Sequence, residues 1–291
     1  MRFSNPGKSI AAILALALLL VMAPFAGAAD RIALVVGNSA YPGAGYLDNP
    51  INDARAVSST LRKLGFEVTQ ALDLDNAGLQ DALETYRDKL ASGDTVGFFY
   101  FAGHAVQISG NNYLIPVDVD FSDVGQLMSK GYDIRKLLDA LSSLSDTMNV
   151  IVLDSCRNNP FAAMDTSQLS RGLKLYSQAT DAQSATTEET STSRMSRDAG
   201  LGRMDGPINT LIAYSTKPGF VALDGSGRNS PYTSALVKMM QQEGVPIAQV
   251  FADVRRLVYE QTGGRQMPWE SSSLTQSFVF KERNKAYATP F

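Results

Sequence analysis

The feature that most constrains this chain is a pair of short apolar runs, each leading to a titratable side chain. One run, Thr95–Ala102, leads through Gly103 to His104, and the other, Asn149–Leu153, leads to Cys156. Both are rich in β-branched or aromatic residues and bounded by Gly or Asp, which is typical of buried parallel strands. The carboxyl ends of parallel strands meet at one edge of a sheet, where sites are built. The sequence therefore predicts that its only histidine and its only cysteine lie at the same edge.

A thiol and an imidazole at one sheet edge suit nucleophilic chemistry. A cysteine becomes a useful nucleophile near neutral pH when a base takes its proton, and imidazole has a suitable pKa. The alternative is that Cys156 is a buried structural residue and His104 an unrelated surface residue. The placement of both at strand ends, with the histidine roughly 50 residues before the cysteine, favours the pair.

Three segments resemble motifs of a known family. They are Tyr100–Ala105 around the histidine, Asp154–Pro160 around the cysteine, and Ala213–Phe220 followed by Asn229–Leu236. In this order they resemble the caspase-like cysteine peptidases, in their bacterial metacaspase branch. The resemblance extends from about residue 31 to residue 280 and is interrupted once. It implies the caspase–haemoglobinase fold, a helix-sheet-helix sandwich of the α/β class with about six mostly parallel strands.

The periodicity of the chain independently predicts an α/β fold. Strand-like apolar segments alternate with segments whose apolar residues recur every three or four positions, which indicates parallel βαβ units. The expected strands are residues 32–36, 66–72, 95–104, 149–156, 209–214 and 277–280. The expected helices are residues 51–64, 79–90, 134–144, 231–242 and 247–261. A hairpin is expected between residues 106–108 and 113–116.

The first 28 residues are typical of a secretory signal peptide. Arg2 and Lys8 precede the apolar run Ile10–Ala23, and small residues follow at Ala26–Ala28. The alternative is an uncleaved anchor, but the run is shorter than the roughly 20 residues that span a bilayer. We therefore expect an exported protein, periplasmic or secreted, without stable membrane insertion after cleavage.

The remaining residues are predicted to form one interrupted domain. Residues 29–162 form a large-subunit region that carries both reactive side chains, and residues 207–291 form a small-subunit-like region that completes the same domain. Between them, residues 163–206 are rich in Ser, Thr, Asp and Gln, which predicts a flexible low-complexity linker. In an oxidising compartment a lone cysteine cannot form an internal disulfide, so Cys156 fits a reactive thiol.

The resemblance implies specific catalytic roles. Cys156 as a thiolate would attack a peptide carbonyl, and His104 would transfer the protons. The backbone N–H groups of Cys156 and of the residue after the histidine, here Ala105, would bind the oxyanion. The family usually has Gly at that second position, and Ala would be penalised there if the site required a positive φ.

The metacaspase resemblance also implies an acidic pocket that accepts Arg or Lys before the scissile bond. Two of its carboxylates correspond to Asp53 and Asp154, and counting on from Phe220 places Asp224 where true caspases carry an arginine. Asp154 has an alternative role as the cap of a turn, and Asp53 as a charge favoured at a helix N-terminus. The expected partners are therefore proteins or peptides with Arg or Lys before the cut.

No cofactor and no metal are expected. A single histidine excludes most zinc sites, and neither a phosphate-binding glycine loop nor a GxSxG elbow is present. The net charge of −3 without basic runs argues against a nucleic-acid partner. The alternative to a peptidase is a catalytically weak or inactive caspase-like module that binds peptides or regulates partners. A non-peptidase α/β hydrolase or flavodoxin-like domain would leave the surroundings of Cys156 unexplained.

Overall fold

The computed structural model describes residues 30–42, 45–91, 93–108, 111–120, 124–144, 147–156, 201, 203–217 and 222–283. The predicted signal peptide and residues 163–200 of the predicted linker lie outside these ranges. Within the described ranges, no helix combines the length and the apolar character needed to cross a bilayer.

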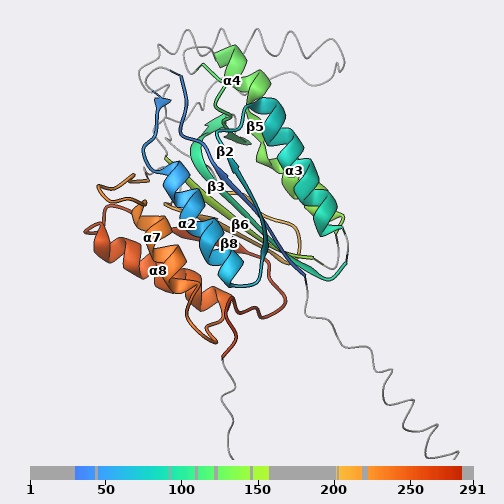
Figure 1. The fold of residues 1–291 in the computed structure, drawn as a ribbon, viewed down its shortest axis with the longest axis vertical. Coiled ribbons are helices and arrows are strands. Elements are labelled where there is room, and N and C mark those ends of the chain that lie inside the picture. Colours follow the sequence, from blue (N-terminus) through green and yellow to red (C-terminus); the bar gives the residue numbers. More distant parts are fainter. Residues whose placement is uncertain are drawn as a thin grey trace, which may run out of the picture.

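The described strands form a mostly parallel sheet, as the sequence predicts (Figure 1). In spatial order its strands are β2 (Glu67–Leu72), β1 (Asp30–Gly37), β3 (Thr95–Ile108), β6 (Thr147–Cys156), β7 (Thr210–Tyr214) and β8 (Trp269–Ser272). All neighbouring pairs are parallel except β7 and β8, which are antiparallel. The α/β sandwich with a mostly parallel sheet is therefore confirmed.

Helices cover both faces of this sheet (Figure 1). The helices of the described ranges are α2 (Pro50–Lys63), α3 (Asn76–Leu90), α4 (Val124–Lys130), α5 (Ile134–Ser142), α7 (Pro231–Met239) and α8 (Ile247–Gln261). One face, with Phe98 and Val150, packs against α2, α7 and α8. The other face, with Phe99 and Ile151, packs against α3 and α5. The central strands are apolar at successive positions because both of their faces are buried.

The order of the strands reverses at the centre of the sheet. From β1 the chain passes to β2 on one side and then returns to β3 on the other side of β1. Ligand sites of open α/β sheets lie at such a reversal of strand order, outside the carboxyl ends of the strands. The ends of β1, β3, β6 and β7 all lie at this edge.

β3 extends beyond the main sheet into a small antiparallel unit. Residues 105–108 pair with β4 (Asn111–Leu114), which pairs in turn with β5 (Tyr132–Asp133). This confirms the predicted hairpin, whereas α4 was not predicted. Tyr41, Ile115 and Leu127 form a separate small core beneath the unit. The chain therefore changes from parallel to antiparallel pairing immediately after His104.

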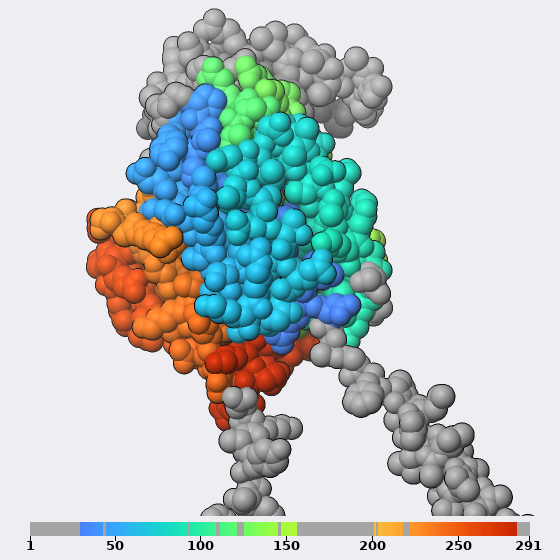
Figure 2. All heavy atoms as spheres, in the orientation of Figure 1, coloured from blue at the N-terminus to red at the C-terminus, as the bar shows by residue number. Residues whose placement is uncertain are grey.

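The C-terminal region packs directly onto the N-terminal region. Figure 2 shows the orange and red C-terminal part against the blue N-terminal part. Leu201 and Met204, which lie within the predicted linker, are buried, and the Met204 N–H donates to the Tyr214 hydroxyl at 3.1 Å. The sequence predicts flexibility for residues 163–206, but the end of this segment is packed, because Leu201 and Met204 anchor it in the core.

The predicted final strand, Ser277–Phe280, is wrong. Phe278 and Phe280 are buried beside α8, and Val279 makes only an isolated bridge with Pro246. Their alternating burial produces the period of two that is typical of a strand. The last strand of the sheet is the polar β8. An edge strand is paired on one side only and does not need a continuous apolar pattern.

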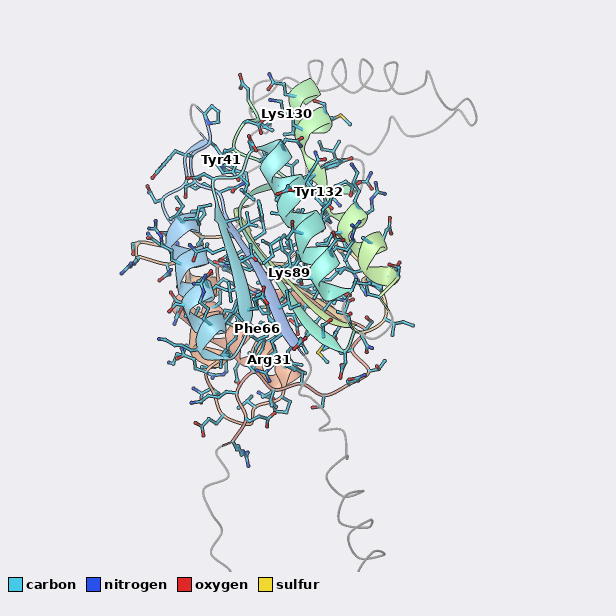
Figure 3. All side chains as sticks on the ribbon, turned by 45° about the vertical axis from the view of Figure 1, so that its right-hand side comes forward. Arg31, Tyr41, Phe66, Lys89, Lys130 and Tyr132 are labelled. Carbon is cyan, nitrogen blue, oxygen red and sulfur yellow. The ribbon has the colours of Figure 1, made fainter. Side chains whose placement is uncertain are left out.

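Arg31 holds this C-terminal segment against the start of β1. Its guanidinium donates to the backbone oxygens of Phe280 at 2.7 Å and Leu64 at 2.9 Å. It also lies over the rings of Phe66 and Phe278, 5.6 and 5.0 Å from their centroids. Figure 3 shows Arg31 beside Phe66. Cation–π contacts of this kind add to the hydrogen bonds. The two ends of the described domain are thus joined at the edge of the sheet opposite the carboxyl ends of the parallel strands.

Candidate active site

The register of two neighbouring strands brings the predicted base and nucleophile together. β3 and β6 are parallel, and His104 is the register partner of Cys156 at the carboxyl ends of both. Paired strands lie roughly 4.8 Å apart, so the two backbones are separated by one strand spacing. The two residues are therefore backbone neighbours on adjacent strands, which transfer of a proton between a thiol and an imidazole requires.

The imidazole of His104 is buried and held by a backbone oxygen. Its Nε2 lies 2.7 Å from the carbonyl oxygen of Gly45. A carbonyl oxygen only accepts hydrogen bonds, so Nε2 carries the proton, and in the neutral ring Nδ1 is the basic nitrogen. Burial lowers the pKa of His104, and the bond to Gly45 opposes that shift. The ring is therefore neutral at pH 7 and able to accept a proton.

The backbone requires glycine at the position before His104 but not at the position after it. Gly103 has φ +155°, and a Cβ there would lie 2.5 Å from the Tyr41 hydroxyl, so only glycine fits. Ala105, the predicted second oxyanion donor, is not among the described residues with positive φ. Its methyl group is buried in the core beside α3 and α5. The penalty expected for alanine at this position is therefore absent.

Asp53 is a buried carboxylate that is held by the loop before α7. It lies in the first turn of α2 and is 2% exposed. Its Oδ1 accepts hydrogen bonds from Nδ2 of Asn229 at 2.8 Å and from the backbone N–H of Ser230 at 3.0 Å. Burial, together with the negative charge of Asp154, raises the pKa of Asp53 to about 8. These two hydrogen bonds oppose the shift only in part.

Asp154 is the second buried carboxylate, and hydroxyl groups hold it. Its Oδ2 accepts hydrogen bonds from Oγ of Ser230 at 2.6 Å, Oγ1 of Thr233 at 2.8 Å and the Tyr100 hydroxyl at 3.4 Å. Burial raises its pKa, and the hydroxyl donors oppose that change. Ser230 also caps α7 by accepting from the Thr233 N–H at 2.9 Å. The start of α7 is thereby tied to both buried carboxylates.

Asp224 completes an acidic group at the same edge. It is partly buried, and its backbone oxygen accepts from Nδ2 of Asn49 at 2.5 Å. Burial raises the pKa of Asp224, and the charges of Asp154 and Asp48 add to the effect. The structure thus brings together the three predicted carboxylates, Asp53, Asp154 and Asp224. The ion pairs found among the described residues include none of the three.

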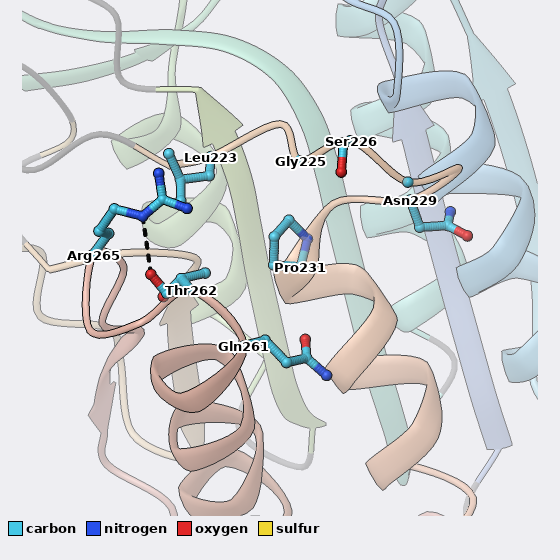
Figure 4. Close-up of a pocket in the computed structure, with 9 residues that line it drawn as sticks. Leu223, Gly225, Ser226, Asn229, Pro231, Gln261, Thr262 and Arg265 are labelled. Carbon is cyan, nitrogen blue, oxygen red and sulfur yellow. Dashed lines mark hydrogen bonds between the residues drawn. The ribbon is translucent and has the colours of Figure 1, made fainter.

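A hollow of about 250 Å³ lies beside the loop before α7 (Figure 4), and none of the three carboxylates is among the residues that line it. Its lining includes Gly225, Ser226, Asn229, Thr262 and Arg265. Arg265 is oriented by a hydrogen bond from its Nε to the Thr262 backbone oxygen at 3.0 Å. Asn229 also donates to Asp53, so the loop before α7 borders both the hollow and the acidic group. No residue of β3 or β6 lines the hollow.

Sequence analysis missed the donors that hold the carboxylates. In the sequence Tyr100 stands out only as part of the histidine motif, and Asn229, Ser230 and Thr233 only as parts of the third family motif. The available signal was their polarity within otherwise apolar surroundings, since buried polar groups are nearly always hydrogen-bonded. Which acid each would contact depends on segments that are distant in the chain.

Comparisons with known proteins agree with this architecture. A family model described as "Caspase domain" matches residues 30–279. Mucosa-associated lymphoid tissue lymphoma translocation protein 1 of Homo sapiens is 30% identical over 132 residues, which is 45% of this chain and 15% of that protein. Its homolog in Mus musculus has the same identity and coverage. The chain thus corresponds to a small part of each of these relatives.

Proposed function

Because the chain belongs to the caspase domain family, whose model matches residues 30–279, we propose that it is a cysteine endopeptidase that cleaves after Arg or Lys. The observation that carries this proposal is the meeting of two features at one sheet edge. One is the register pairing of His104 with Cys156, and the other is the acidic group formed by Asp53, Asp154 and Asp224.

The proposed reaction is acyl transfer in two steps. Nδ1 of His104 takes the proton of the Cys156 thiol, and the thiolate attacks the peptide carbonyl carbon. The same imidazolium then protonates the leaving amine as the C–N bond breaks, which leaves a thioester on Cys156. A water molecule, deprotonated by His104, hydrolyses the thioester. The backbone N–H groups of Ala105 and Cys156 are proposed to stabilise the oxyanion in both steps.

The proposed specificity rests on the charge of the acidic group. A buried carboxylate is costly unless it is paired with a cation or hydrogen-bonded. The hydrogen bonds described above occupy Oδ1 of Asp53 and Oδ2 of Asp154, whereas a carboxylate offers about four lone-pair positions on its two oxygens. A guanidinium or ammonium group that enters beside these acids would supply the missing positive charge through charge-assisted hydrogen bonds.

A panel of short fluorogenic peptides tests the proposal directly. The protein without residues 1–28 is expected to hydrolyse peptides with Arg or Lys before the fluorophore at least about tenfold faster than the Asp equivalent, since even one charge-assisted bond contributes about 1.5–3 kcal/mol. Faster hydrolysis of the Asp peptide would contradict the assigned specificity. Binding of the Arg peptide without any turnover would indicate the alternative, an inactive peptide-binding module.

The acidic group should also make substrate affinity depend on pH. A proton on Asp53 must leave before a cation binds, because burial and the charge of Asp154 raise the pKa of Asp53 to about 8. The KM of an Arg peptide is therefore expected to fall as pH rises from 6 to 8 and to level off above. His104, whose pKa is lowered, is already neutral over most of this range.

A citrulline peptide, which is neutral and nearly isosteric with the Arg peptide, is the control for this pH dependence. Equal pH dependence for both peptides would show that the carboxylates do not contact the substrate side chain.

A further inference from the structure

Tyr41 makes a set of contacts around His104 that the proposed reaction does not yet use. It follows β1 and is 4% exposed, at the carboxyl edge of the sheet (Figure 3). Its hydroxyl accepts a hydrogen bond from the His104 N–H at 2.9 Å and donates one to the Ile115 carbonyl oxygen at 3.0 Å. The Ile115 N–H in turn donates to the His104 carbonyl oxygen at 3.0 Å. One hydroxyl group therefore connects the backbone of the proposed base to the segment after β4.

The ring of Tyr41 also contacts the imidazole itself. The two ring centroids are 4.5 Å apart with an interplanar angle of 63°, which is an edge-to-face arrangement. A second contact comes from the same loop, because the Gly45 carbonyl oxygen binds Nε2. The loop after β1 therefore contacts the imidazole both through the ring of Tyr41 and through a hydrogen bond at Nε2.

The position of the Tyr41 hydroxyl coincides with the change of strand pairing. At this point β3 leaves its parallel partner β6 and begins to pair with β4. Gly103 turns the chain with φ +155°, and the hydroxyl fills the space where any other residue would place its Cβ. Without the hydroxyl, the His104 N–H and the Ile115 carbonyl would each lose a buried partner, and the peptide unit before His104 would be less firmly oriented.

We propose that Tyr41 is the positioning residue of the base: its hydroxyl fixes the backbone of His104, and its ring fixes the orientation of the imidazole beside β6. This inference rests on the proposed function only for its effect on catalysis. Proton transfer requires the base to lie within hydrogen-bond reach of the thiol, and small misplacements reduce the rate steeply. Tyr41 acts through His104 and transfers no proton itself, so its effect is expected on kcat rather than on KM.

The single histidine of the chain makes the proposal measurable without an activity assay. In protein free of a histidine tag, NMR titration reports His104 alone. Tyr41→Phe keeps the ring and removes only the hydroxyl. Tyr86→Phe, which removes the hydroxyl of another buried tyrosine on α3, is the matched control. We expect Tyr41→Phe to move the titration midpoint of His104 towards that of a free imidazole, because a less restrained ring is better hydrated. The control should titrate like the parent.

Two rates complete the test. Alkylation of Cys156 by iodoacetamide at pH 7 should slow about tenfold in Tyr41→Phe and remain unchanged in Tyr86→Phe, because only the former disturbs the base. With the Arg peptide, kcat should fall about tenfold to hundredfold while KM changes less than about twofold. An unchanged titration and an unchanged alkylation rate in Tyr41→Phe would overturn the proposal.

The remaining outcomes are also decisive. If the titration and alkylation change as expected but the parent hydrolyses no peptide, the positioning role stands and the proposed function fails. If Tyr41→Phe does not fold, hydrogen exchange of the parent's His104 amide provides the answer. A hydroxyl-bound amide should be protected, and exchange as fast as that of an exposed loop would refute the role of Tyr41.

Discussion

Replacement of Cys156 by alanine is expected to abolish peptide hydrolysis, with a fall in kcat of at least about a thousandfold. The methyl group cannot form the thioester, so the two-step route is closed and only slow background hydrolysis remains. Turnover of the Arg peptide by the purified variant measures the effect. The kcat of the His104→Ala variant should be lower than that of the parent by about a hundredfold or more, because the thiol would lose its base.

Ser155→Ala is the matched control for Cys156→Ala. Ser155 precedes the cysteine on β6 and is 1% exposed, and its hydroxyl has no hydrogen-bond partner among the described residues. Removing it leaves no buried partner unsatisfied, so hydrolysis should stay close to that of the parent. If Cys156→Ala cleaved the Arg peptide as fast as Ser155→Ala, the assignment of the nucleophile would be wrong.

Removal of one charge from the acidic group is expected to produce the second large effect. Asp154→Asn and Asp53→Asn should each lower kcat/KM for the Arg peptide about tenfold to a hundredfold, corresponding to the loss of about 1.5–3 kcal/mol from a charge-assisted bond. The citrulline peptide should be much less affected, because it presents no positive charge. The measured quantity is the ratio of kcat/KM for the two peptides.

The same substitution at Asp53 should stabilise the fold at alkaline pH. The folded-state pKa of Asp53 is about 8, above the usual value of 3.8. Between these values the folded protein binds more protons than the unfolded chain, so stability falls as pH rises through this window, by up to about 1.4 kcal/mol per pH unit. Asp53→Asn removes this loss. Thermal unfolding at pH 5 and pH 9 should show a smaller decrease in Tm for the variant.

Asp88→Asn controls for a general effect of removing an acid. Asp88 is exposed on α3, and among the described residues its ion pair is with its neighbour Arg87, so neither the peptide ratio nor the pH dependence of Tm should change. Asp53→Asn would contradict the proposal if it lowered hydrolysis of the Arg and citrulline peptides equally. It would contradict the stability argument if its Tm fell with pH as steeply as that of the parent.

The sequence by itself determined the class of fold and the chemistry available at one sheet edge. Buried parallel strands are apolar on both faces and end in turns, and this pattern is local, so β1, β3, β6 and β7 were predictable. The starts of helices were predictable for the same reason: Ser230 and Pro231 specify the first turn of α7 through a side-chain cap and a fixed φ. The positions of His104 and Cys156 at strand ends followed from the same local pattern.

Only the tertiary structure decided which residues meet at that edge. The polar strand β8 joins the sheet through backbone hydrogen bonds on one side, which leave little trace in side-chain periodicity. Asp154 meets Ser230, and Asp53 meets Asn229, across large separations in the chain. The pKa of Asp53 and the φ of Gly103 depend on burial and on a facing hydroxyl group, and neither exists until the chain has folded. Local patterns specify elements, whereas burial and long-range contacts set the charge and geometry of a site.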